Sequence, residues 1–130
     1  HVMQCRAEID AYYREQLAHV PGITCLPQGR QTVANHSYFP ILVGPEYPLS
    51  RDALYEKLKE NGIYARRYFY PLISDFPMYK SLPSSTAETV KEAKVSAANV
   101  LCLPIFPALT PADQNKILYT IKNINQKENA

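Results

Sequence analysis

The sequence contains little glycine and little cysteine, and what it lacks excludes several kinds of functional motif. Only four of its 130 residues are glycine, and neither a G-x-G-x-x-G nor a G-x-x-x-x-G-K-[ST] pattern occurs. Without such a loop, we do not expect this chain to cradle a nucleotide phosphate on its own backbone. No apolar run approaches the roughly 20 residues of a membrane-spanning helix. The three cysteines, Cys5, Cys25 and Cys102, show neither C-x-x-C nor metal-type spacing, which favours free thiols in a reducing compartment.

Charge and histidine spacing exclude further classes of function. The formal net charge of +2 is too small to argue for binding to nucleic acid or to an anionic membrane. The three histidines, His1, His19 and His36, have no H-x-x-x-H or H-x-H spacing, so we expect no metal site and see no self-contained catalytic set. Among them only His36 stands at the entrance of a predicted strand, where a structural role is the commoner outcome. Arg6 and Glu8 near the start are not typical of a secretory leader, and we expect a cytoplasmic protein.

Helical and strand patterns alternate along the chain, and 11 prolines mark the ends of elements. Apolar residues at helical spacing predict helices over residues 2–18, 50–62, 85–99 and from 110 onward. Runs rich in β-branched, aromatic and other apolar residues predict strands over 23–26, 36–43, 63–70 and 100–106. This order predicts an α+β domain with a small, mostly antiparallel sheet that helices cover on one face.

Capping residues define the expected ends of the helices. Ser50 can accept a backbone hydrogen bond at the start of one helix, and Gly62 can adopt the left-handed conformation that ends it. Ser85 and Glu88 have capping-box spacing at the start of the next helix. Thr110 is the expected N-cap of the last one.

The stretch Y-A-R-R-Y-F-Y-P-L, Tyr64 to Leu72, concentrates aromatic rings and arginines. A strand would divide its side chains between two faces, Tyr64, Arg66, Tyr68 and Tyr70 on one and Ala65, Arg67 and Phe69 on the other. The first face is unusual for a core, because each buried phenol and guanidinium needs a partner. It suits a ligand with anionic and hydroxyl groups, since arginine offers a planar fork and tyrosine offers a ring with a donor. The alternative is that the arginines are solvated or paired with Glu56 and Glu60.

Three segments in a fixed order carry a resemblance to a known family. They are N-H-S-Y-F-P-I-L-V, S-R-D-A-L-Y-E-K-L-K-E-N-G-I-Y-A-R-R-Y-F-Y-P-L and V-L-C-L-P-I-F-P-A-L-T, the last ahead of a closing amphipathic helix. The most specific pieces are Gly62-Ile63, the turn from Tyr68 to Ile73, and L-P-I-F-P-A-L-T. The sequence resembles the C-terminal segment of the DegT/DnrJ/StrS-type sugar aminotransferases, pyridoxal-phosphate enzymes that act on nucleotide-linked keto sugars. The resemblance covers nearly all 130 residues. In the detail of R-R-Y-F-Y-P, the sequence is similar to members that act on dTDP-linked keto sugars.

The resemblance implies that this chain is the small C-terminal domain of a fold-type-I enzyme. Residues 1–20 would be the helix that leads out of a large N-terminal domain, and residues 21–130 the small domain. In the family, the large domain carries the lysine that forms the Schiff base with pyridoxal phosphate. Because the lysines here fall on charged helix faces, we expect this chain alone neither to hold the cofactor nor to turn over. The resemblance also implies a homodimer and glutamate as the amino donor.

The same resemblance assigns candidate residues to the cleft between the two domains. It places Tyr68 where many relatives have histidine, and Ile73 where they have a second histidine. The turn faces the cleft in relatives, which implies contacts to cofactor, sugar or an anionic group. The candidate cleft residues are Tyr68, Tyr70, Arg66, Arg67, Phe69 and His36.

Two alternatives from other classes stay open on the sequence alone. One is a small split βαβ module that stacks RNA or another ligand on its sheet, because tyrosines near arginines are typical of such sheets. The low net charge and the absence of an R-G-F-G-F-V-like strand count against it. The other is a purely structural or regulatory domain without a site.

Overall fold

The elements follow the order that the sequence predicts. The computed structural model describes residues 1–124 except 28 and 30–32. Its helices are α1 (Val2–Leu17), α2 (Arg51–Glu60), α3 (Lys91–Asn99) and α4 (Pro111–Lys122). Its strands are β1 (Ile23–Cys25), β2 (Phe39–Val43), β3 (Arg66–Arg67) and β4 (Val100–Leu103), and two 3₁₀ turns, η1 (Ile73–Asp75) and η2 (Pro83–Ser85), lie between β3 and α3. No helix among these residues has the length and apolar character needed to cross a membrane.

The four strands form one antiparallel sheet in the order β1–β2–β4–β3. Across the β2–β4 pair, Phe39 is opposite Leu103 and Ile41 is opposite Leu101. Since successive side chains of a strand point to opposite faces, these four residues share one face. All of β4 is buried, whereas β2 is fully buried only at alternate residues. The predicted small antiparallel sheet is confirmed.

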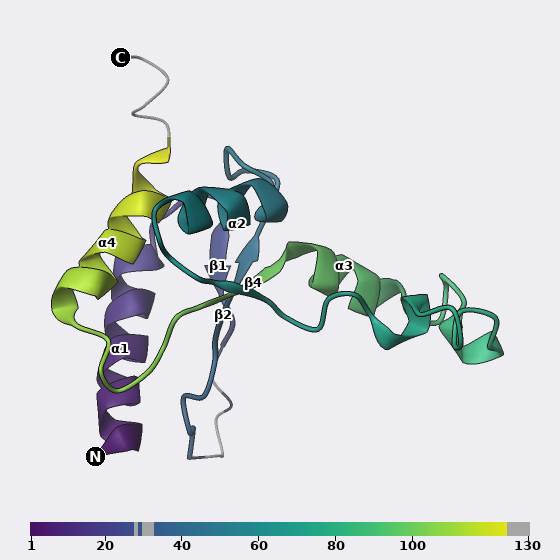
Figure 1. Ribbon diagram of the computed structural model, residues 1–130, viewed down its shortest axis with the longest axis horizontal. Coiled ribbons are helices and arrows are strands. Elements are labelled where there is room, and N and C mark those ends of the chain that lie inside the picture. Colours follow the sequence, from purple (N-terminus) through teal and green to yellow (C-terminus); the bar gives the residue numbers. More distant parts are fainter. Residues whose placement is uncertain (28, 30–32, 125–130) are drawn as a thin grey trace.

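Three helices cover one face of this sheet (Figure 1). Tyr13 of α1, Leu58 of α2 and Ile121 of α4 are buried in one core with Phe39 and Leu101. The rings of Tyr13 and Phe39 meet edge to face, with their centroids 5.0 Å apart. The prediction of an α+β domain with helices on one face is therefore confirmed.

The caps predicted for α2 and α4 are also confirmed. The Ser50 hydroxyl accepts from the Ala53 amide at 3.2 Å, and the Thr110 hydroxyl accepts from the Asp113 amide at 3.1 Å. Gly62 follows α2 with a φ of 74°. Each cap satisfies a backbone group that the helix itself leaves unpaired.

The predicted start of α3 is wrong. The helix begins at Lys91, whereas Ser85 closes the turn η2. The hydroxyl of Thr86, one residue after Ser85, accepts from the Thr89 amide at 3.3 Å. That bond stabilises an isolated turn ahead of the helix, because Ser, Thr and Asp side chains satisfy backbone groups in turns as well as at caps.

The predicted strand over residues 63–70 is mostly wrong, because β3 consists of Arg66 and Arg67 alone. Arg67 is paired with Leu101, and the next partner along β4 would be Val100. Val100 directly follows α3 and is the first residue of its strand. β4 therefore offers β3 at most one further partner residue, whatever the β propensity of the residues that follow Arg67.

Residues 68–90, which we call the arm, leave the sheet and extend with α3 away from the rest of the molecule (Figure 1). An ion pair of 3.9 Å between Lys94 and Asp75 connects α3 to the arm. The large apolar side chains that the arm exposes are Phe69, Tyr70, Ile73, Phe76, Met78, Tyr79 and Leu82. A concentration of this kind marks an interaction surface.

Candidate functional site

The candidate site lies on the sheet face opposite the three helices. Arg66 is paired with Cys102, which alternates with the core residue Leu101, so Arg66 points away from the helical layer. Arg66 lines a groove of about 250 Å³ together with Tyr64 and Tyr38. It forms neither a hydrogen bond nor an ion pair with any residue in the described ranges. An exposed, unpaired guanidinium in a groove is suited to binding an anion.

Aromatic rings continue this groove toward the arm. The centroids of Tyr38 and Tyr68 are 5.3 Å apart, and those of Tyr68 and Phe69 are 4.1 Å apart. Phe69 has a φ of 48°, a left-handed conformation that is rare for a bulky side chain. Sequence reasoning missed Tyr38 as a site residue, although its alternation with the core residue Phe39 already placed it on the outer face.

Arg67 lies on the opposite face, as alternation predicts, and Tyr70 joins it there because the strand ends before the alternation can reach Tyr70. Arg67 is 3.3 Å from Asp52 and 3.8 Å from Glu56, so it is held against α2. Its guanidinium lies 4.4 Å from the ring centroid of Tyr55 and 5.3 Å from that of Tyr70. The structure thus unites Tyr64, Arg66 and Tyr68 but places Tyr70 with Arg67. The pairing of Arg67 with Glu56 agrees with the structural alternative for that arginine.

His36 is held by α1. Its Nδ1 lies 3.4 Å from a carboxylate oxygen of Asp10, which is buried and also pairs with Arg14 at 2.6 Å. Arg14 in turn donates to the Leu26 carbonyl at 2.7 Å. The groove is lined by Ser37 and other residues that follow His36. The geometry therefore gives His36 a role in fixing the entrance to β2, which is the commoner role that the sequence suggested.

Arg51 is a buried cation that sequence reasoning missed. It is 4% exposed, and its guanidinium donates to the carbonyls of Ala97 and Val100 at 2.9 and 3.1 Å. It also pairs with Asp52 at 2.9 Å and lies 5.1 Å from the Tyr70 ring centroid. These contacts satisfy carbonyls where α3 meets β4, so Arg51 stabilises the base of the arm.

Two of the three cysteines are poorly suited to act as nucleophiles. Burial raises the pKa of the Cys102 thiol to about 11, and the charge of nearby Arg66 offsets this only in part. Burial likewise raises the pKa of Cys25. All three cysteines are free thiols, as predicted. A thiol with a raised pKa is a poor nucleophile at neutral pH.

Neither metal ligands nor a buried lysine occur in the part of the chain that the structure describes. No group of three or more histidine, cysteine or acidic side chains could hold a metal ion there. The lysines at 57, 59, 80, 91, 94, 116 and 122 are all exposed or half-buried. A lysine that forms a Schiff base is typically desolvated.

Comparisons with known proteins find relatives that match most of this chain. The chain is 48% identical over 104 residues to a dTDP-4-amino-4,6-dideoxy-D-glucose transaminase of Escherichia coli, covering 80% of this chain and 28% of the relative. It is 42% identical over 119 residues to the transaminase of the same name in Shigella dysenteriae, covering 92% of this chain and 32% of the relative. The chain thus spans about a third of the length of these relatives.

A solved structure confirms the architecture. The sugar aminotransferase CalS13 from Micromonospora echinospora superimposes with a TM-score of 0.77 at 20% identity, over 95% of this chain and 31% of that protein. At this identity the likeness concerns the fold alone. A sequence model of the DegT/DnrJ/EryC1/StrS aminotransferases matches residues 1–122, in agreement with the resemblance found in the sequence. The chain belongs to the DegT/DnrJ/EryC1/StrS aminotransferase family.

Proposed function

We propose that this chain is the C-terminal domain of a pyridoxal-phosphate enzyme that transfers an amino group from glutamate to a nucleotide-linked keto sugar. The family membership and the printed activities of the two curated relatives support this proposal. This chain covers only 28% and 32% of the length of these relatives, which supports a second part of the proposal. In that part, the other two thirds of such an enzyme lie outside this chain. The free cysteines support a cytoplasmic location, since reducing compartments keep thiols unpaired.

The observation that carries the proposal is the unpaired Arg66 beside the Tyr38–Tyr68–Phe69 rings. Arg66 would bind the substrate diphosphate with its planar fork. The phenol of Tyr68, half-buried against two rings, would contact the sugar or the cofactor edge from a fixed position. Arg67 and Arg51 would hold the arm in place from the opposite side, with Tyr70 between them.

When bound, pyridoxal phosphate would supply the electron sink for amino transfer, and a lysine would have to hold it covalently between turnovers. The described residues do not fit that covalent role, because each lysine among them reaches solvent. We therefore assign this chain the role of a substrate-facing wall and assign the lysine to the large N-terminal domain. Purified chain mixed with the cofactor should keep no absorbance band after dialysis.

The arm supplies the surface for the missing partner. Its exposed apolar side chains are continuous with the candidate site through Phe69, whose ring contacts Tyr68. We propose that the large N-terminal domain covers this surface and thereby closes the cleft. A homodimer of the whole enzyme is part of the same proposal.

A chimera tests the proposal directly. The matching segment of the Escherichia coli relative, which is 48% identical, would be replaced by this chain. We expect the chimera to act on the sugar that the relative's name states, and Arg66→Ala to raise KM about tenfold or more, because a charge-assisted contact to the substrate is lost. Lys59→Ala, at an exposed position of α2, is the matched control.

A folded chimera that binds the cofactor but has no activity would contradict the proposed function. Unchanged kinetics on replacing both Arg66 and Tyr68 would instead support a purely structural domain.

A further inference from the structure

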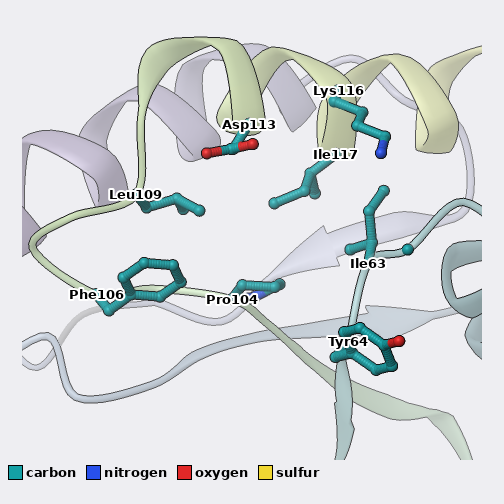
Figure 2. Close-up of a pocket in the computed structure, with 9 residues that line it drawn as sticks. Ile63, Tyr64, Pro104, Phe106, Leu109, Asp113, Lys116 and Ile117 are labelled. Carbon is teal, nitrogen blue, oxygen red and sulfur yellow. The ribbon is translucent and has the colours of Figure 1, made fainter.

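The aromatic rings that line the groove of Arg66 come from different places in the fold. Tyr64 and Phe106 also line an adjoining pocket of about 310 Å³, which Figure 2 shows between the start of α4 and the segment that leads into β3. Tyr38 comes instead from the residue directly before β2, and it is 50% exposed. A ring with half of its surface in solvent is held weakly by its own packing. Its position therefore depends on the backbone that carries it.

Helix α1 holds the chain on both sides of Tyr38. Phe39, the next residue, is fully buried, and its ring meets that of Tyr13 of α1 edge to face. His36, two residues before Tyr38, has its Nδ1 3.4 Å from a carboxylate oxygen of Asp10, which also belongs to α1. The side chain of Tyr38 points to the opposite face of the sheet from Phe39. An element of the helical layer thus fixes the backbone of a residue on the outer face.

The backbone at His36 needs such a contact. Its φ of 49° lies in the left-handed region, which residues other than glycine and asparagine rarely adopt. The Asn35 side-chain oxygen accepts from the Ser37 amide at 3.1 Å, so the chain turns sharply at this point. A strained turn of this kind persists only where surrounding contacts hold it. The contact of His36 with Asp10 supplies that hold.

Asp10 is itself fixed in place. It is 4% exposed, and Arg14 donates to its carboxylate at 2.6 Å and to the Leu26 carbonyl at 2.7 Å. A buried carboxylate keeps to the position where it is paired, because leaving it unpaired is costly. Leu26 follows β1 and His36 precedes β2, so α1 holds the connection between these strands near both of its ends. We call Asp10, Arg14 and His36 the clamp.

We propose that Asp10 and His36 are positioning residues for the candidate groove, which place the ring of Tyr38 without contacting the ligand themselves. This inference rests on the proposed function, because it assumes that the groove receives the substrate. Asp10 holds the turn at His36, and the turn directs Tyr38 to the Tyr68 ring, with the two centroids 5.3 Å apart. The clamp prepares one side of the groove before the ligand arrives. Binding then does not have to order that ring.

Two replacements of His36 separate the role of its side chain from that of its backbone. His36→Gly tolerates the positive φ but has no group that can contact Asp10. His36→Asn tolerates the same φ and carries an N–H donor close to the place of the Nδ1 atom. In NMR spectra of this chain, we expect nuclear Overhauser contacts between the Tyr38 and Tyr68 rings to be lost in His36→Gly and kept in His36→Asn. This measurement needs neither cofactor nor activity.

The chimera with the Escherichia coli relative gives the matching kinetic test. His36→Gly should raise KM for the nucleotide-linked sugar about threefold to tenfold and leave kcat within about twofold, on the scale of ordering one side chain upon binding. His36→Asn should keep KM within about twofold of the unmodified chimera. In a Tyr38→Ala background, His36→Gly should raise KM no further, because its effect passes through that ring.

Two more variants complete the set. Asp10→Ser, in a chain shown by circular dichroism to be folded, should reproduce both effects of His36→Gly; if it does not fold, the two His36 variants decide alone. His19→Gly makes the same change at an exposed histidine that does not line the groove. It should leave the ring contacts and KM unchanged.

Ring contacts and a KM that stay unchanged in His36→Gly would overturn the inference. So would His36→Asn as impaired as His36→Gly, since the contact with Asp10 would then have no part in the effect. A full effect of His36→Gly on KM in the Tyr38→Ala background would overturn it as well. An inactive chimera would remove the proposed function, whereas the ring contacts in this chain would still decide whether the clamp positions Tyr38.

Discussion

At the scale of single residues, Gly22 and Gly62 both have a positive φ, 76° and 74°, so substitutions there test how much the backbone conformation contributes to stability. This conformation costs an L-residue about 1 kcal/mol. A Cβ on Gly22 would lie 2.1 Å from the Tyr47 amide nitrogen, whereas the nearest atom to one on Gly62 is the Lys116 Nζ at 3.9 Å. We expect Gly62→Ala to lower the free energy of unfolding by about 1 kcal/mol and Gly22→Ala by at least twice as much. Equal losses of unfolding free energy in the two variants, measured by urea unfolding, would contradict the close approach of Gly22 to the Tyr47 backbone.

Cys102 gives a prediction for alkaline pH. Burial raises its pKa from the ordinary 9.0 to about 11, so folding favours the protonated thiol. Its contribution to stability is fully present below pH 9 and is lost as the pH rises through 11. Between neutral pH and pH 11, the unfolding free energy of the wild type should fall by about 2 kcal/mol more than that of Cys102→Ala. Urea unfolding at a series of pH values measures both. Parallel stability curves for the two proteins would show that the thiol is not desolvated.

At the scale of elements, Arg51 connects the start of α2 to the junction of α3 and β4. Arg51→Met keeps most of the side-chain length but leaves the Ala97 and Val100 carbonyls without their donor. We expect a loss of about 3 kcal/mol in unfolding free energy, because buried polar groups are left unpaired. Lys59→Met, on the exposed side of α2, should change stability by no more than about 0.5 kcal/mol. A similar small loss in both variants would refute the role of Arg51.

Helices and central strands were predictable from the sequence because their determinants are local. The caps at Ser50 and Thr110 and the apolar periodicity of α4 each depend on residues within one or two turns. β3 and the arm were not predictable in the same way, because the length of β3 depends on where α3 gives way to β4. The aromatic run after Arg67 has the composition of a strand but no partner.

The candidate site was predictable in part for the same reason. Arg66 and Tyr64 lie on the outer face, as alternation within two or three residues predicted. Tyr70, which alternation placed with Arg66, lies instead beside Arg67, which Asp52 and Glu56 of α2 hold in place. The pocket that Asp113 lines combines residues 62–64 with residues 104–117, and only the cap role of Thr110 beside it was visible in the sequence.

At the scale of the whole molecule, the arm surface should matter for assembly and not for the stability of this domain. Ile73 and Met78 are each 71% exposed. Replacing both by serine should change the unfolding free energy of this chain by less than about 0.5 kcal/mol, since little buried area is lost. In the chimera with the Escherichia coli relative, the same changes should lower the melting temperature and activity. Val95→Ser, on α3 and outside the arm, is the control, and a chimera insensitive to the arm changes would refute the docking proposal.

The contact between α1 and α4 has a consequence for how the chain is made. Tyr12 donates to Asn115 at 2.6 Å, and Lys122 donates to Gln16 at 2.7 Å. The partners in the first bond are 103 positions apart in the sequence, and those in the second are 106 positions apart. During translation at about 5–20 residues per second, the first helix waits roughly 5–20 s for its partner to leave the ribosome. Throughout that interval the apolar side of the nascent first helix is open to water and to other chains. Chaperones that bind short apolar segments should therefore bind the nascent chain at α1.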